Sequence, residues 1–280
     1  MDLTQKTQHL STNQLLAAVA DGVSIFDLSR PMELGMAQSP NHPQFRLSMP
    51  RRHGDMVRVD GGSAANDLLV TGTHVGTHID ALGHVSQCGE LYGGADALQT
   101  QTGGRLMSHG VEEIPLLVRR GVLLDIAGLH NVECLEGGYE ITPEHLDAAA
   151  EAAGVSVQPG DVVLIRSGWG RWWSDSTRYV GVASGVPGVG EAGARWLAQR
   201  QPIAAGADTI AFECLHPNAG HAVLPAHRVL LVESGIFIIE ALALDELAQA
   251  QIHEFLFVLT PLHLVGATGS PVRPIAVVGA

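Results

Sequence analysis

The sequence has few cysteines, few charged residues and no long apolar run. Its 280 residues include only three cysteines, Cys88, Cys134 and Cys214, which lie far apart and form no CxxC pair. This spacing argues against a disulfide framework and a cysteine-based zinc site, and it predicts reduced thiols. Because no run of about 18 uninterrupted apolar residues occurs, we expect no transmembrane helix.

Charged side chains make up only 16% of the chain, and their balance is acidic. The formal net charge is −13 at pH 7, and the pI is near 5.4. Such a balance argues against nucleic acid and against anionic membranes as partners. The first residues, MDLTQKTQHLSTNQ, lack the basic, apolar and small-residue order of a signal peptide, so we expect a cytoplasmic location.

Hydrophobic residues make up 46% of the chain, which excludes intrinsic disorder. The length permits one domain or two, but no repeat, low-complexity tract or linker is present, so we expect one domain over residues 1–280. Residues 1–62 form its N-terminal arm. In the part at 31–62 the hydrophobic residues show neither helical nor strand periodicity. This part is either a long functional loop or an arm that packs on a neighbouring subunit.

Strands and helices alternate from about residue 120 onward, which predicts an α/β fold in layers. The clearest helix spans 142–154, with a capping residue at Thr142 and a glycine stop at Gly154. Other helices are expected at 12–20, 190–200, 225–235 and 244–251. Strands are expected at 23–29, 67–74, 121–127, 161–167, 235–242 and 254–264, with two short strands around Gly206 and an edge strand at the end of 266–278.

One short segment holds three histidines and an aspartate, namely His74, His78, Asp80 and His84. In a straight strand His74 and His78 would lie roughly 13 Å apart, at about 3.3 Å per residue. Two imidazoles that each bind one metal ion at about 2.1 Å cannot span that distance. A shared metal therefore requires a bend, which Gly76 permits. His78 and Asp80 face the same side of an extended segment.

Imidazole and carboxylate are the ligands that suit Zn²⁺ or Mn²⁺. Three protein ligands, the metal triad His74, His78 and Asp80, leave positions open for water and substrate, and a bound ion lowers the pKa of its water to about 7. His84 is then placed to move protons as a general acid/base. The alternative is that these are loop histidines with satisfied hydrogen bonds and no ligand. Four ligand-type residues at this spacing favour the metal site.

The pattern His74-x-Gly76-Thr77-His78-x-Asp80-x-x-x-His84 resembles the HxGTHxDxPxH signature of the cyclase family of metal-dependent hydrolases. That family includes bacterial kynurenine formamidase and isatin hydrolase. The likeness continues through GVLLDIA, PGDVVLIRSGW and GATGSPVRPIAVV, and it is greatest with the longer, isatin-hydrolase-like branch. Gly83 stands where the signature has proline. The resemblance implies a swivelling β/β/α fold, a single domain with mixed sheets and flanking helices.

The resemblance also assigns roles to residues. It makes the metal triad the ligands of a first ion and His84 the general acid/base. His227 and Glu240 match a histidine and a glutamate that complete a second metal site; without Glu240 the better model is a single Mn²⁺ site with His227 near the substrate. The implied cofactor is one or two divalent ions, Mn²⁺ or Zn²⁺.

The implied activity is that of a metal-dependent amidohydrolase. Its metal-activated water would hydrolyse a cyclic amide of the isatin type or an aryl formamide of the N-formylkynurenine type, so the partner is a small, aromatic molecule. A lactone hydrolase of the dienelactone type would look alike in sequence. A metal-dependent binding protein without turnover is the alternative from another class, and it would have no need of His84. Members of the family are usually oligomers, and the chain has a long N-terminal arm. The resemblance and the arm together imply a homodimer or homotetramer.

Other residues allow two interpretations each. Phe45 reaches a pocket of its own or of a neighbouring subunit, and Arg273 meets either a substrate carboxylate or a buried acid. His216 and His221 are expected to be solvent-exposed loop histidines. Three tryptophans either line an aromatic pocket or pack beneath a long loop: Trp169, Trp172 and Trp173.

Overall fold

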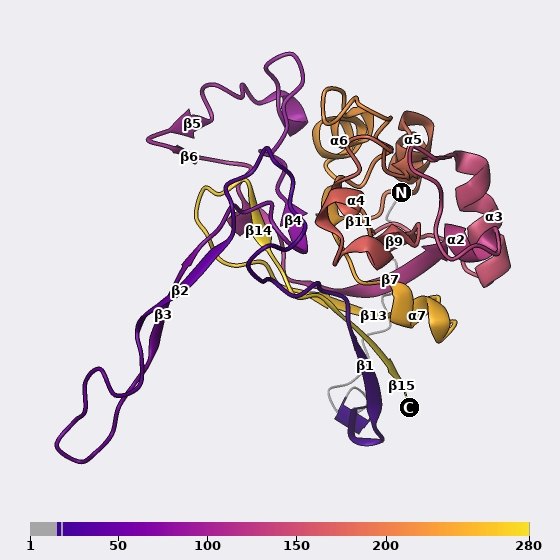
Figure 1. Ribbon diagram of the computed structural model, residues 1–280. Coiled ribbons are helices and arrows are strands. Elements are labelled where there is room, and N and C mark those ends of the chain that lie inside the picture. The colour runs from indigo at the N-terminus through magenta and orange to yellow at the C-terminus, as the bar shows by residue number, and fades with distance from the viewer. Residues whose placement is uncertain (1–15, 18, 280) are drawn as a thin grey trace.

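A nine-stranded mixed sheet forms the centre of the computed structural model, which describes residues 16, 17 and 19–279. The strand order is β1-β15-β13-β7-β9-β11-β12-β4-β14. Helices lie against the sheet, as the ribbon shows (Figure 1). The strands of this sheet are β1 (Val23–Asp27), β4 (His78–Asp80), β7 (Leu117–Asp125), β9 (Val162–Arg166), β11 (Ala204–Ala207), β12 (Phe237–Glu240), β13 (Glu254–Leu259), β14 (Gly269–Pro271) and β15 (Ile275–Gly279).

The remaining elements are short strand pairs and helices. The pairs are β2 (Arg46–Arg51) with β3 (Asn66–Val70), β5 (Gln101–Thr102) with β6 (Arg105–Leu106), and β8 (Glu140–Ile141) with β10 (Gly188–Val189). The α-helices are α2 (Ile126–Leu129), α3 (Pro143–Ala153), α4 (Ser176–Val180), α5 (Glu191–Arg200), α6 (Pro225–His227) and α7 (Asp245–Gln249). The 3-10 turns are η1 (Tyr92–Gly94), η2 (Val111–Glu113) and η3 (Trp169–Trp172), and η4 (Arg228–Ser234) is a π-helix.

The middle of the sheet is parallel and buried on both faces. Strands β7, β9, β11 and β12 run in the same direction, and antiparallel strands flank them. Successive residues of β7 point to opposite sides: Val122 and Leu124 pack under α3 and α5, whereas Leu123 packs in the second core near α7. The predicted α/β fold with a mixed sheet and flanking helices is confirmed.

Helix α3 ends where the sequence predicts. Thr142 and His145 form a reciprocal cap at its start, and Gly154 adopts a left-handed backbone with φ 65° at its end. Glycine takes this conformation without a steric penalty, so it stops the helix. The helix expected at 12–20 lies mostly outside the described residues. No helix among the described residues is both long and apolar enough to cross a membrane.

Three predicted elements differ in the structure. The second strand after Gly206 does not form, because the chain turns at Asp208, whose side chain binds a neighbouring loop. The helix expected at 225–235 is a three-residue α-turn followed by the π-helix η4. The C-terminal strand β15 is not an edge strand: it lies between β1 and β13, and β1 forms the edge.

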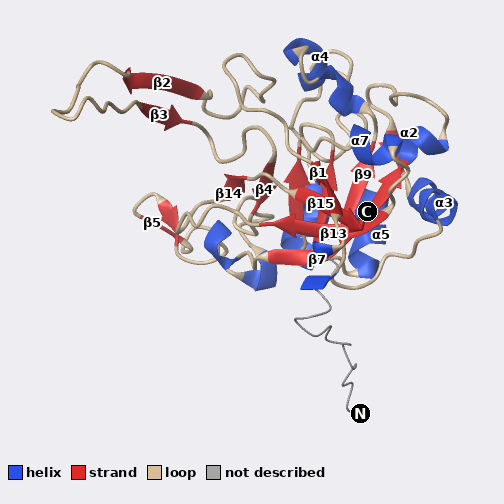
Figure 2. Cartoon of the chain, turned by 90° about the horizontal axis from the view of Figure 1, so that it is seen from below, coloured by secondary structure: helices blue, strands red, loops and turns tan. Residues whose placement is uncertain are grey.

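Strands β2 and β3 form a hairpin that projects from the body in both views (Figures 1 and 2). Every residue of both strands is exposed. The segment predicted as a loop or arm at 31–62 therefore contributes one strand of a projecting hairpin, and the second strand comes from the segment expected as a strand at 67–74. We call residues 46–70 the hairpin arm.

Asp208 ties the turn after β11 to the turn after β9. Its carboxylate is fully buried and accepts hydrogen bonds from the Ser167 N–H (2.9 Å), the Ser167 hydroxyl (2.6 Å) and the Gly168 N–H (2.8 Å). Burial raises the pKa of Asp208, and the Ser167 bonds oppose that rise. The connection places the tryptophan-rich turn at the carboxyl end of the parallel strands.

We expect Asp208→Ala to destabilise the fold by about 3 kcal/mol, because it leaves three donors without their acceptor, at about 1 kcal/mol or more each. Urea unfolding measures the change. Asp175→Ala is the matched control: Asp175 is an exposed cap of α4 that accepts from the Arg178 N–H, so its loss should cost about 1 kcal/mol. Equal losses in the two variants would contradict the role given to Asp208.

Candidate metal centre

The site lies where strand β4 enters the sheet beside the carboxyl end of β12. The antiparallel register sets Glu240 opposite His78 and Ile238 opposite Asp80. Since alternate residues of a strand face the same side, His78, Asp80 and Glu240 project together. The carboxyl ends of parallel strands are the common position of ligand sites in α/β sheets.

A turn at Gly76 brings His74 back onto the strand that carries Asp80. Gly76 has φ 71°, in the left-handed region that favours glycine. As a result the Nδ1 of His74 lies 2.7 Å from Oδ1 of Asp80, and the rings of His74 and His78 are 5.3 Å apart, centroid to centroid. The bend that a shared site requires is present at the predicted glycine.

Two histidines present the same nitrogen to the site. The Nδ1–H of His78 donates to the Gly76 carbonyl (2.8 Å), and the Nδ1–H of His227 donates to Glu213 (2.6 Å). In the neutral form of each ring Nε2 therefore carries the lone pair, and both Nε2 atoms turn toward the same two carboxylates. His78 Nε2 lies 3.5 Å from Asp80 and 3.4 Å from Glu240, and His227 Nε2 lies 3.7 Å and 3.2 Å from them.

The two carboxylates lack a counter-ion that matches their burial. Asp80 and Glu240 are only 1% and 5% exposed. Among the described residues, Asp80 Oδ2 and Glu240 Oε1 have no hydrogen-bond partner. Buried carboxylates without partners are costly unless a cation is near.

The pKa values of two neighbouring histidines are raised, which shows that the buried carboxylates favour a positive charge beside them. Burial alone would lower the pKa of His78, but the bond to Glu240 and the charge of Asp80 raise it to about 9. Burial likewise opposes a charge on His227, yet the bond to Glu213 and the nearby carboxylate of Glu240 raise its pKa well above the usual value. A divalent ion between these side chains would supply the charge instead, so the residues fit a metal.

Two groups of side chains have the spacing of a metal site. His74, Asp80 and His84 form one, and Asp80, His227 and Glu240 form the other. Within each group one ligand atom per residue lies within 4.8 Å of the others. Asp80 belongs to both groups, as a bridging ligand between two ions would.

His84 lies beside the ligands as a neutral base. Its ring stacks on His74 at 3.8 Å, and its centroid is 6.3 Å from that of His227. Burial and the neighbouring histidines lower the pKa of His84 to about 3, against the charge of Asp80. His84 therefore lies close enough to His74 and Asp80 to share a metal site with them.

Sequence reasoning missed three residues of the site. Glu213 is fully buried and accepts from His227 and from two backbone N–H groups, those of Ala226 and His227. A glutamate within the apolar run IAFECL was its only signal. Thr268 bonds the Nε2 of His74 at 2.8 Å, and the ring of His42 stacks on His74 at 5.4 Å. Nothing in the local sequence separates these two from other loop residues.

The tryptophans divide between two surroundings. Trp173 borders the small cavity beside His74 and His78, which has a volume of about 20 Å³. Trp169 and Trp172 border a separate pocket of about 460 Å³ that also contains Cys134. Only one of the three tryptophans therefore lies at the candidate site.

Three other residues that the sequence analysis singled out, Phe45, His216 and His221, belong to neither group of candidate ligands. Phe45 is buried against its own chain, beside Met36 and Val75. His216 is exposed as predicted, but His221 is only partly exposed and lies 3.3 Å from the Asn41 side chain. Burial is the first cause that lowers the pKa of His221, so the expectation that His221 is solvent-exposed is wrong.

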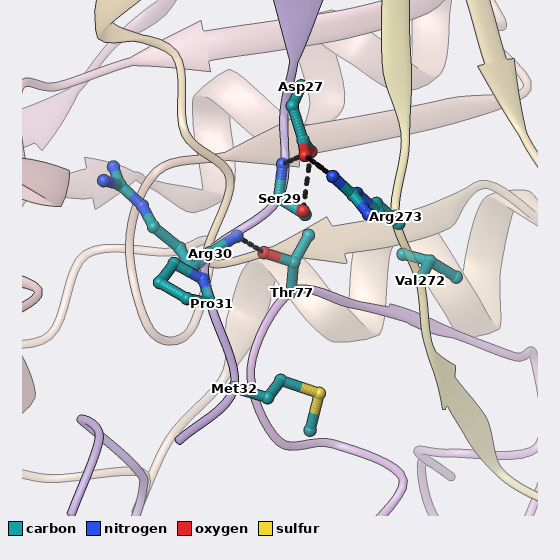
Figure 3. A pocket seen from close by; sticks show the side chains of 8 residues that line it. All are labelled: Asp27, Ser29, Arg30, Pro31, Met32, Thr77, Val272 and Arg273. Atoms are coloured by element: carbon teal, nitrogen blue, oxygen red, sulfur yellow. Dashed lines mark hydrogen bonds and ion pairs between the residues drawn. The ribbon is translucent and has the colours of Figure 1, made fainter.

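Arg273 meets an acid of its own chain in a pocket of about 410 Å³. It pairs with Asp27 at 2.7 Å, and that acid is 42% exposed rather than buried. In the same pocket the Arg30 N–H donates to the Thr77 hydroxyl (Figure 3). None of the residues that line this pocket is one of the candidate ligands.

The family model described as putative cyclase matches residues 26–214, more than half of the chain. The chain belongs to the putative cyclase family. No curated protein is significantly similar to this cyclase-family sequence.

Solved structures share the fold of this cyclase-family chain over almost its whole length. A structure described as a novel cyclase is 26% identical, with a TM-score of 0.83, over 95% of this chain and 93% of that one. Isatin hydrolase A from Ralstonia solanacearum is 22% identical, with a TM-score of 0.75, over 97% and 98%. An isatin hydrolase bound to the product analogue thioisatinate is 20% identical, with a TM-score of 0.73, over 97% and 100%.

We expect Glu213→Gln to weaken metal binding by about 10- to 100-fold, since a carboxylate that holds a ligand histidine sets its tautomer and its basicity. Titration of chelator-stripped protein with Mn²⁺ or Zn²⁺ measures the affinity. Glu136→Gln, at an exposed glutamate, is the control and should leave it unchanged. Wild-type affinity in Glu213→Gln would show that Glu213 does not position His227.

Proposed function

We propose that the chain is a metal-dependent hydrolase that opens a cyclic amide of the isatin type or an aryl formamide of the N-formylkynurenine type. One observation carries the proposal: the Nε2 atoms of His78 and His227 converge on two buried carboxylates that have unpartnered oxygens. The fold shared with two isatin hydrolases supports the cyclic amide. A lactone hydrolase of the dienelactone type remains the alternative within the family.

Five side chains would hold the metal. His74, His78 and Asp80 would hold a first ion, and His227 and Glu240, with Asp80 between, would hold a second. A bound Mn²⁺ or Zn²⁺ supplies Lewis acidity toward a carbonyl and lowers the pKa of a water molecule.

His84 is neutral at pH 7 because burial and the neighbouring histidines depress its pKa. As a neutral imidazole next to the candidate ligands it would accept a proton from the attacking water and return it to the leaving nitrogen. The indole of Trp173 would form an apolar wall for an aromatic ring, since it borders the cavity beside His74.

His84→Ala separates an enzyme from a binding protein. We expect hydrolysis to fall by a few hundredfold while metal content stays unchanged, because removing a general acid/base costs about 10²- to 10⁴-fold. Metal-loaded protein is assayed with isatin, N-formylkynurenine and a dienelactone. Full activity in His84→Ala would exclude its acid/base role. A wild type that binds metal and hydrolyses none of the three would favour a binding protein.

We also propose that the protein is a homodimer in which each hairpin arm packs on the other copy. Leu47 and Leu69 lie opposite each other on the two strands and are about half exposed, 48% and 55%. The arm carries four arginines against three aspartates, although the chain has a net charge of −13. An apolar, slightly basic arm therefore complements an acidic body.

The separated free cysteines support a cytoplasmic location.

The double variant Leu47→Glu, Leu69→Glu should be a monomer, because two facing carboxylates replace apolar contact area in the arm. Sedimentation velocity measures the mass of the particle. The control is Leu98→Glu, at a leucine that is 79% exposed and lies outside the arm. A monomeric wild type, or a double variant that keeps the wild-type mass, would exclude this assembly.

A further inference from the structure

The cavity beside the candidate ligands is too small for any organic substrate. Its volume is about 20 Å³, and a cavity of about 10–15 Å³ on this measure holds one water molecule, so this one has room for about one water. His74 and His78 line it, so it is a space through which a substrate could approach two of the candidate ligands. Part of its wall must therefore move before a molecule the size of a bicyclic amide can reach the ligands.

One segment forms a partition between this inner cavity and a larger outer pocket. Gln38, Ser39 and His42 line the inner cavity, and the same three residues line an outer pocket of about 410 Å³. Ala37 and Phe45, at the two ends of this segment, are buried (2% and 7% exposed). Residues 38–44 thus lie between two anchors, with space on both sides.

Hydrogen bonds within the segment make it a single unit. The Gln38 amide donates to the His42 and Pro43 carbonyls (3.0 Å each), and its carbonyl oxygen accepts from the Phe45 N–H (3.1 Å). The segment forms no strand or helix. It can move as a unit without breaking the sheet.

One side-chain contact connects this segment to the loop that follows Glu213. The Asn41 amide lies 3.3 Å from Nδ1 of His221, 180 residues away in sequence. His221 is only partly exposed. The contact therefore joins residues 38–44 to the loop between Glu213 and α6.

His42 is the side chain that this segment brings to the ligands. Its ring stacks on His74 at 5.4 Å with an interplanar angle of 28° and also lines the inner cavity. It belongs to neither of the two ligand groups found among the described residues. An imidazole at this position has an N–H for the oxygen of a bound carbonyl compound.

We propose that residues 38–44 are a flap that opens to admit substrate and, on closing, places His42 against the substrate carbonyl. Asn41 and His221 are the latch of the closed state. The role of His42 rests on the proposed hydrolase function, whereas the movement of the flap does not.

The flap is tested by the reactivity of a buried position. Ala241 lines the inner cavity and is 4% exposed, so a thiol introduced by Ala241→Cys should react with a bulky thiol reagent only when the flap opens. Adding Asn41→Ala should raise the labelling rate at this position about 5-fold, the effect of one lost hydrogen bond. Mass spectrometry separates this site from the three natural cysteines.

Two controls make the labelling test decisive. Gln99→Ala, which removes an exposed hydrogen bond to Asp96, should leave the rate unchanged. If Asn41 and His221 form one latch, Asn41→Ala with His221→Ala should label no faster than either alone. An unchanged rate in Asn41→Ala, or additive effects of the pair, would overturn the latch.

The contact of His42 with substrate is tested by kinetics. His42→Ala should lower kcat about 100-fold, as the loss of one donor to a developing oxyanion does, with metal content unchanged. His42→Gln keeps an N–H donor and should recover part of that loss. Wild-type kcat in His42→Ala would overturn the contact. A wild type without hydrolase activity would overturn it together with the proposed function, whereas the flap is judged by labelling alone.

Discussion

The burial of Asp80 and Glu240 in one small space is the constraint on which the site depends. Two carboxylates that have lost water repel each other and need positive charge. His78 and His227 each face both carboxylates, and His74 lies 2.7 Å from Asp80. Both imidazoles use their Nδ1–H elsewhere, so each keeps a lone pair at Nε2 when the ring is neutral. Two carboxylates and two neutral imidazoles that face one another are stable when a cation lies between them, which is why we interpret the arrangement as a candidate metal site.

The backbone around the two buried glutamates is strained where it holds them. Phe212, before Glu213, and Ala241, after Glu240, have φ of 58° and 55°, although neither is a glycine. Such conformations cost about 1–3 kcal/mol each and persist only where the surroundings impose them. The Thr77 hydroxyl donates to the Ala241 carbonyl at 2.7 Å and so ties the segment before β4 to the end of β12. The signature threonine thus connects the two strands that carry the ligands.

Local chemistry made the central part of the site predictable. His74 and His78 cannot bind one ion from a straight strand, so the chain must bend between them. Gly76 is the residue that permits this bend. The parallel core and helix α3 followed from apolar runs and capping residues in the same way. Glu213 and His42 reach the site through pairings across long stretches of chain, for which a single sequence holds no signal. The position of β15 inside the sheet has the same cause, because β1 adds to it from the other end of the chain.

Rigidity in the sheet determines which part of the site can move. Ile79 and Ile239 lie beside the ligand residues on β4 and β12, are fully buried and face each other in the core of the sheet. Moving either strand would open that core, at a cost of about 1.5–3 kcal/mol for each exposed isoleucine. The turn that carries Trp173 is held by the buried bonds of Asp208. The segment between Ala37 and Phe45 is not paired with any strand of the sheet. Moving this segment should therefore cost less free energy than moving β4, β12 or the turn at Trp173, and we expect substrate to reach the candidate ligands there.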